Sequence, residues 1–276
     1  MRRVVTIVVV LLIVAAIVGS IPIAVRKVRD AAALTQCTNN IRQLGMALAS
    51  YEWSHKRFPT GVTSKAVDLP AEKRLSWMIE IIPAYVESSP RTVFDVKKSW
   101  DDVANCPPRQ RRGEGGMDEL LPTPFDQPMG EITLLICPSN RSHFEPTRPS
   151  QTHYVGVAGW GDDAAELPLS DPNAGLFGYE RIVRMDNLKH GAETTLMVAE
   201  ALDGGPWTAG GRATVRGFHP DRDCFGPGAP FSSNHPAGVN VLFADASVRI
   251  FRLDIEPLLV RRHAVLSGEA IPAFED

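Results

Sequence analysis

Residues 4–25, VVTIVVVLLIVAAIVGSIPIAV, form an uninterrupted apolar run near the start of this 276-residue chain. The run contains no charged residue, and as a helix its 22 residues would reach roughly 33 Å. Because the hydrocarbon core of a bilayer is about 30 Å thick, residues 4–25 are predicted to form a transmembrane helix. The lipid bilayer is therefore the first expected partner, and residues 1–3 are expected to form a short tail.

Residues 26–58 predict an amphipathic continuation of the same helix. Beyond a basic break, six apolar residues recur at gaps of three and four, which places them on one stripe: Leu34, Cys37, Ile41, Leu44, Leu48 and Tyr51. The helix is expected to end near Phe58, because Pro59 and Gly61 do not continue it. We therefore expect one helix that leaves the membrane and presents an apolar face to a soluble domain.

The charges that flank the apolar run do not decide its orientation. Arg2 and Arg3 precede the run, and Arg26, Lys27 and Arg29 follow it, so the positive-inside rule favours neither direction. The run is longer than the apolar region of a cleaved signal peptide, which indicates a retained anchor. Because a three-residue tail would stay in the cytoplasm most easily, we expect a single-pass protein with a cytoplasmic N-terminus and an extracytoplasmic C-terminal domain.

Composition describes the remainder of the chain. A net charge of −3 gives no indication of a nucleic-acid partner. Residues 59–130 are predicted to contain one helix and a loop-rich insertion. Residues 131–276 have the pattern of short strands separated by turns that contain Gly and Pro. Strands are expected at 132–137, 153–158, 194–199 and 212–216, followed by a hairpin at 238–253 and a helix at 255–266. This order predicts an α+β fold, in which the helix stripe covers one face of an antiparallel sheet.

The four cysteines are widely spaced and form no CxxC pair, so the sequence predicts no metal site. In an oxidising compartment they allow one or two disulfides, with three full pairings. Cys37 lies on the helical stripe, where burial is the expected role. Cys106, Cys137 and Cys224 therefore remain as the candidate disulfide residues.

Several segments together resemble a known family, the bacterial domain-of-unknown-function family 1559. Thr35–Tyr51 is similar to the N-terminal helix of that family, and His235 with Asp245 matches the His and Asp positions of its H-x9-D-G motif. Other similar segments are Ile136–Ser139, Tyr154–Gly159, Thr195–Glu200 and Gly205–Trp207. The resemblance implies a pilin-like envelope protein, whose long transmembrane helix continues into an antiparallel sheet domain with a C-terminal helix.

Two positions depart from the pattern of that family. Prepilin-type segments carry a Gly at the cleavage site and a Glu five residues later, but residues 2–8 read RRVVTIV and the apolar run contains no Glu. We therefore expect neither prepilin processing nor assembly through that Glu. The second departure is Ala246, which replaces the Gly of the motif and would cost about 1 kcal/mol if the turn requires a positive φ.

The sequence carries no signature of an enzyme, and no cofactor is expected. His235 and Asp245 flank a predicted strand and would lie about 30 Å apart, too far for an acid–base pair, so a structural role is expected for both, with ligand binding as the alternative. Trp160, Trp207 and Asp223 lie in Gly-rich loops and are the candidate binding residues. The leading hypothesis is a structural or interaction role, with a second copy or another envelope protein as partner. The alternative, implied by a solute-binding label sometimes attached to the family, is a tethered solute- or glycan-binding module.

Overall fold

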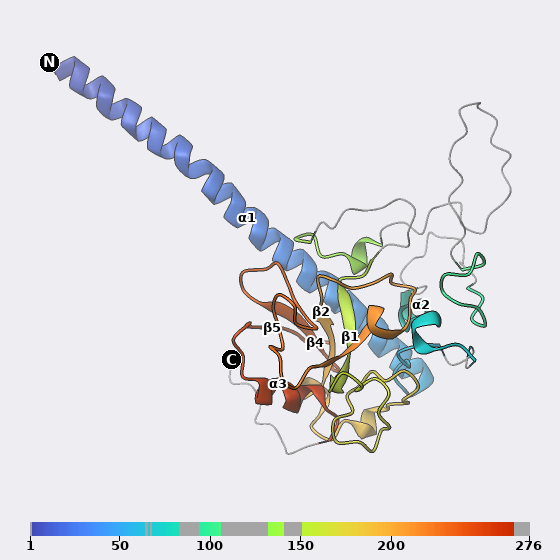
Figure 1. Ribbon diagram of the computed structural model, residues 1–276. Helices are drawn as coiled ribbons and strands as arrows, with labels where there is room; N and C mark the ends of the chain where they lie inside the picture. Colours follow the sequence, from blue (N-terminus) through green and yellow to red (C-terminus); the bar gives the residue numbers. More distant parts are fainter. Residues whose placement is uncertain are drawn as a thin grey trace, which may run out of the picture.

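The computed structural model describes residues 2–63, 66, 68–82, 94–105, 132–140 and 151–267. A long helix, α1 (Arg2–His55), is followed by a domain built on a five-stranded sheet (Figure 1). The strands are β1 (Tyr154–Trp160), β2 (Leu196–Glu200), β3 (Val215–Phe218), β4 (Val239–Phe243) and β5 (Val248–Phe251). The described residues also contain two shorter helices, α2 (Met78–Ile81) and α3 (Pro257–Ala264). They contain five 3-10 turns as well: η1 (Ala71–Lys73), η3 (Thr133–Leu135), η4 (Met185–Asn187), η5 (Ala192–Thr194) and η6 (Gly211–Ala213).

Helix α1 is continuous through both predicted segments. It ends at His55, where Lys56 adopts a left-handed φ of 56° after donating its backbone N–H to the Glu52 carbonyl. The N-terminal part projects away from the domain, and the C-terminal part lies along it (Figure 1). The predicted helix therefore forms, and it ends three residues before Phe58.

The sheet has the order β3-β1-β2-β4-β5. Strand β1 pairs antiparallel with β2, as do β2 with β4 and β4 with β5, but β1 and β3 run parallel. The expected purely antiparallel sheet is thus corrected to a mixed sheet. Residues 201–214 carry the chain from β2 past β1 to the edge of the sheet, where β3 runs antiparallel to β2 and therefore parallel to β1.

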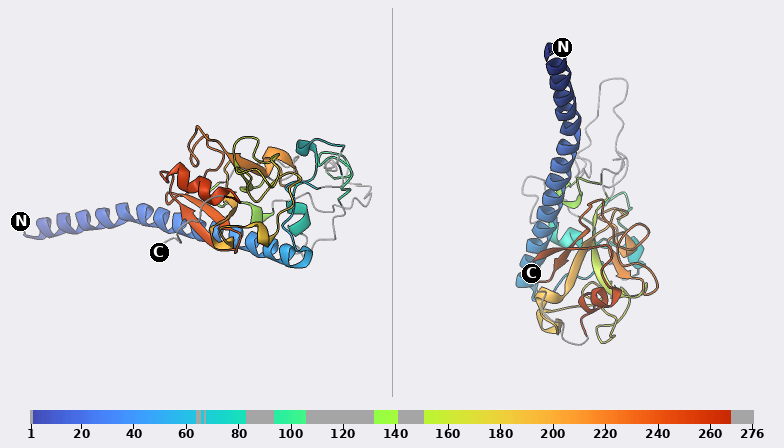
Figure 2. Two further views of the ribbon diagram at one scale, coloured as in Figure 1. Left: turned by 90° about the horizontal axis from the view of Figure 1, so that it is seen from below. Right: turned by 90° about the vertical axis from the view of Figure 1, so that its left-hand side faces the viewer.

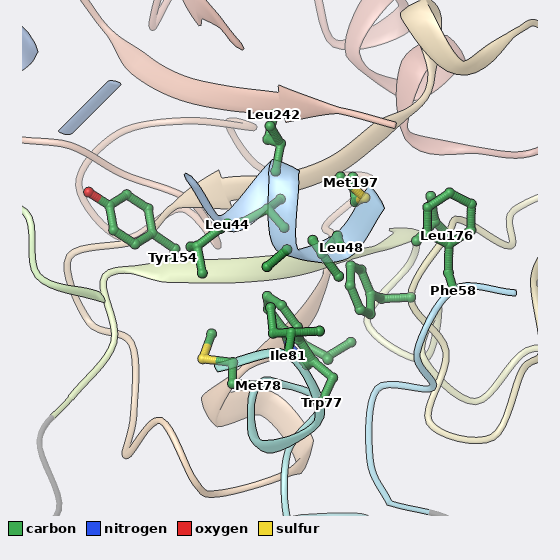
Figure 3. Packing of buried hydrophobic residues seen from close by; sticks show 14 of the residues in the cluster. Leu44, Leu48, Phe58, Trp77, Met78, Ile81, Tyr154, Leu176, Met197 and Leu242 are labelled. Carbon is green, nitrogen blue, oxygen red and sulfur yellow. The ribbon is translucent and has the colours of Figure 1, made fainter. Parts of the chain in front are cut away.

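A helix covers each face of the sheet. Leu44 and Leu48 of α1 pack with Leu242 and Met197 on one face, in a cluster that also contains Trp77 (Figure 3). On the other face, Val260 and Ala264 of α3 pack in a second cluster with alternate residues of β1 and β4 (Figure 2). This alternation follows from the two-residue period of a strand, which sends successive side chains to opposite faces.

One predicted element differs in the structure. Residues 132–137 contain the turn η3 (Thr133–Leu135) rather than a strand, and Asn40 of α1 donates its amide N–H groups to the carbonyls of Thr133 and Ile136 at 3.1 Å. These carbonyls therefore bond to a side chain instead of a neighbouring strand. Residues 75–86 were expected to form a helix or a buried segment, and in the described part, residues 75–82, every residue except Glu80 is buried and residues 78–81 form α2.

The β4–β5 hairpin forms as predicted, and Ala246 lies in its turn. Asp245 Oδ1 accepts a hydrogen bond from the backbone N–H of Ser247 at 2.9 Å, and Ala246 adopts a φ of 66°. This is the left-handed conformation that a glycine would adopt without strain. Asp245 therefore holds a turn, the role predicted for it.

Candidate functional site

His235 enters the interior of the domain from a tight turn just before β4. Its carbonyl accepts a hydrogen bond from Gly238 N–H at 3.2 Å, and Gly238 has a φ of 128°. A Cβ atom at residue 238 would lie 2.1 Å from the Phe251 carbonyl oxygen, so only glycine fits where the turn meets β5. The turn leaves His235 4% exposed.

Three other segments bring ligand-type side chains to His235. Cys37 comes from α1, Cys137 follows η3, and Glu200 is the last residue of β2. The two sulfurs, one imidazole nitrogen and one carboxylate oxygen all lie within 4.8 Å of one another, and all four residues are buried. We call Cys37, Cys137, Glu200 and His235 the buried cluster.

The contacts within the buried cluster centre on Nε2 of His235. This nitrogen lies 3.3 Å from the Cys137 sulfur and 3.5 Å from Glu200 Oε1. The other ring nitrogen, Nδ1, lies 3.3 Å from the hydroxyl of Ser139. Glu200 Oε2 accepts hydrogen bonds from the backbone N–H and the side-chain amide of Asn240, at 3.0 and 2.8 Å. The imidazole and the carboxylate are therefore each held in place from the side that faces away from the other.

These contacts determine the charges of the cluster. Burial alone would lower the pKa of His235, but its hydrogen bonds to Cys137 and Glu200 and the Glu200 charge raise that pKa to about 9. Burial would raise the pKa of Glu200, whereas its bonds to His235 and Asn240 hold that pKa below the ordinary value. The hydrogen bond with Cys37, together with burial, raises the pKa of the Cys137 thiol. The cluster thus holds an imidazolium–carboxylate pair beside the protonated thiol of Cys137.

A comparison of the whole chain with protein families identifies its relatives. The family described as "Protein of unknown function (DUF1559)" matches residues 26–223, more than half of the chain. The chain belongs to this family. Among the curated proteins and among the solved structures, no match was found.

The match to the DUF1559 family includes three members of the buried cluster: Cys37, Cys137 and Glu200. His235 and Asp245 lie beyond its last matched residue. The structure places these two residues in different surroundings, with His235 inside the cluster and Asp245 in the hairpin turn.

The three candidate binding residues lie in different packing environments. Trp160 stacks on Phe218 with ring centroids 6.0 Å apart, on the α3 side of the sheet. Trp207 is buried in the α1-side cluster, and Asp223 is exposed. A pocket of about 510 Å³ lies elsewhere, lined by Pro70–Glu72, Arg74, Ala165–Pro168 and Tyr179–Arg181. The structure therefore does not bring the three residues to this pocket, and their binding role remains a prediction.

The cysteines divide into two groups. Cys37 and Cys137 meet in the buried cluster, whereas Cys224 is a separate buried thiol, whose pKa burial and the nearby Asp223 charge raise to about 11. Cys37, Cys137 and Cys224 are all free in the structure, which gives no disulfide between Cys137 and Cys224. Cys106 lies outside the described residues.

Glu200 was not among the site residues predicted from the sequence, although its position at the end of an apolar strand marks it as unusual. A carboxylate ends the apolar strand that reads LMVAE, and all five residues are buried. A buried carboxylate needs hydrogen-bond donors or a cation, so this position predicted a polar partner from elsewhere in the chain.

Proposed function

We propose that this protein is a membrane-anchored, pilin-like envelope protein whose exported domain has a structural or interaction role. The single observation that carries the proposal is the division of α1 into two halves. The first half carries exposed aliphatic side chains, including Val4 and Leu12 at 65% exposure, and the second half buries one face against the sheet. An exposed apolar surface of this length is stable in a bilayer and costly in water.

The same helix supports a pilin-like arrangement without pilin-type processing. A transmembrane segment that continues into the core of a sheet domain is the expected pilin architecture, but the cleavage-site Gly and the Glu of prepilin segments are missing. We therefore propose a retained anchor, with a second copy of the chain or another envelope protein as its partner. The proposal includes neither an enzymatic activity nor nucleic-acid binding.

Labelling of single introduced cysteines tests the orientation. Asp221→Cys lies in an exposed loop of the domain, and Arg3→Cys lies at the opposite end of the apolar run. When a membrane-impermeant maleimide is added to intact cells, we expect the cysteine at residue 221 to be labelled. The cysteine at residue 3 should be labelled only after the cells are permeabilised. The reverse pattern would contradict export of the domain.

The pocket beside η1 favours one alternative, a tethered solute- or glycan-binding module. It contains the exposed carboxylate of Glu180, paired with the buried Arg74 at 2.6 Å, and the ring of Tyr179. A thermal-shift screen of the full-length protein with sugars and small solutes tests this function. A ligand whose stabilisation disappears in Tyr179→Ala would support the binding module, and no stabilisation by any ligand would exclude it for that library.

A further inference from the structure

The buried cluster has the composition of a metal site, and this inference goes beyond the proposed envelope role. Two thiols, one imidazole and one carboxylate are the donor types that proteins use to bind zinc. They come from residues 37, 137, 200 and 235, so only the folded chain assembles them. We propose that Cys37, Cys137, Glu200 and His235 bind one zinc-class divalent ion, which fastens α1 to the sheet.

The spacing of the donor atoms fits tetrahedral coordination. With bonds of about 2.0–2.3 Å, ligand atoms around zinc lie roughly 3.3–3.8 Å apart. The two distances from His235 Nε2, 3.3 Å to Cys137 Sγ and 3.5 Å to Glu200 Oε1, fall in this range. Since every pair lies within 4.8 Å, shifts of about 1 Å or less would close the tetrahedron.

The surroundings of the cluster are also those of a metal site. Metal-bound histidines usually bond through their other ring nitrogen to a neighbouring polar group, and Ser139 occupies that position beside Nδ1 of His235. Asn240 holds the distal oxygen of Glu200, and its own side-chain oxygen accepts a hydrogen bond from Thr38 of α1 at 2.9 Å. Both potential ligands are therefore oriented before an ion arrives.

Zinc binding would displace protons from the ligands of the buried cluster. Zinc binds cysteine as thiolate and histidine as neutral imidazole, so binding displaces into solution the protons that these groups carry. With two thiolates, one neutral imidazole and the Glu200 carboxylate as ligands, the complex carries a net charge of −1. Because the four residues lie on separate segments, the ion would stabilise only the folded protein.

A disulfide between Cys37 and Cys137 is the alternative explanation for the proximity of the two sulfur atoms. Such a bond would use neither the imidazole nor the carboxylate, and it would leave that buried ion pair beside it. The structure has both thiols free, with a hydrogen bond between them.

Metal analysis of the full-length protein in detergent, loaded with Zn²⁺ under reducing conditions and then desalted, tests the proposal. We expect one zinc ion per chain, lost in Cys37→Ser and in His235→Ala. Cys224→Ser is the matched control, because Cys224 is a buried free cysteine outside the cluster, and it should retain the ion. With Co²⁺ in place of Zn²⁺, the wild type should show the absorption bands of tetrahedral thiolate coordination.

A milder variant keeps the test decisive if Cys37→Ser does not fold. Ser139→Ala leaves all four ligands in place and should weaken zinc binding by about 10–100-fold. Three results would overturn the proposal: equal zinc content in the wild type and Cys37→Ser, equal zinc affinity in the wild type and Ser139→Ala, or a Cys37–Cys137 disulfide detected by mass spectrometry in protein isolated from membranes.

Discussion

Replacing Leu44 with alanine should loosen the attachment of α1 to the domain. The Leu44 side chain is fully buried between the helix and the sheet, near Leu242 (Figure 3). Leu→Ala removes buried carbons worth about 0.8 kcal/mol each, about 2.4 kcal/mol in total, and the remaining cavity adds to this cost. We expect the free energy of unfolding to fall by about 3 kcal/mol, which for a domain of this size lowers the Tm by about 6–12 °C.

Tryptophan fluorescence during thermal unfolding of the full-length protein in detergent measures this change, because Trp77 and Trp207 are buried in the same cluster as Leu44. Met46→Ala is the matched control: residue 46 lies on the same helix turn and is 48% exposed, so its replacement should change stability by less than about 0.5 kcal/mol. An equal Tm for the two variants would refute the claim that this stripe of α1 is buried against the sheet.

Three further changes test local features. Ala246→Gly should raise the free energy of unfolding by about 0.5–1 kcal/mol, because it relieves the left-handed φ of 66°; a lower Tm would contradict this account. Gly238→Ala should lower the free energy of unfolding by about 2 kcal/mol more than Gly226→Ala does. Both glycines have a positive φ, but only a Cβ atom at residue 238 would clash, with the Phe251 carbonyl oxygen. Equal Tm values for the two variants would exclude the clash. His263 is buried near Arg249, and burial lowers the pKa of its imidazole. The free energy of unfolding should therefore fall as the pH drops below about 6.5, because the unfolded chain then binds a proton that the folded chain does not. His263→Leu should reduce the fall in Tm measured from pH 7.5 to 5, and an unchanged fall would assign the effect to another group.

The helix and most of the strands were predictable from local patterns. The three- and four-residue gaps of the α1 stripe correspond to side chains that are buried from Cys37 to Tyr51, because a helix has one periodicity wherever it packs. Strands β1, β2, β4 and β5 overlap the predicted apolar runs for the same local reason. The pairing of β3 parallel to β1 was not predictable, because parallel pairing depends on the path of the connecting loop.

The buried cluster could not be predicted from spacing. Sequence motifs for metal sites rely on ligands two to five residues apart, whereas this cluster takes one residue from each of four segments that only the fold brings together. The nine residues between His235 and Asp245 predicted that the two do not form one site, but they gave no information about Cys37 or Glu200. Long-range packing of α1 against β2 and β4 decides their proximity.

Extraction of the full-length protein from bacterial membranes with alkaline carbonate tests the central claim most directly. The claim is that α1 is both a membrane anchor and part of the domain core. The wild type and Met46→Arg should remain in the membrane pellet, because residue 46 lies on α1 beyond the apolar run of residues 4–25. The double variant Leu12→Arg/Ile13→Arg places two charges in the apolar run, at about 2.5–3.5 kcal/mol each, and should be released. Release of the wild type, or retention of the double variant, would contradict the anchor.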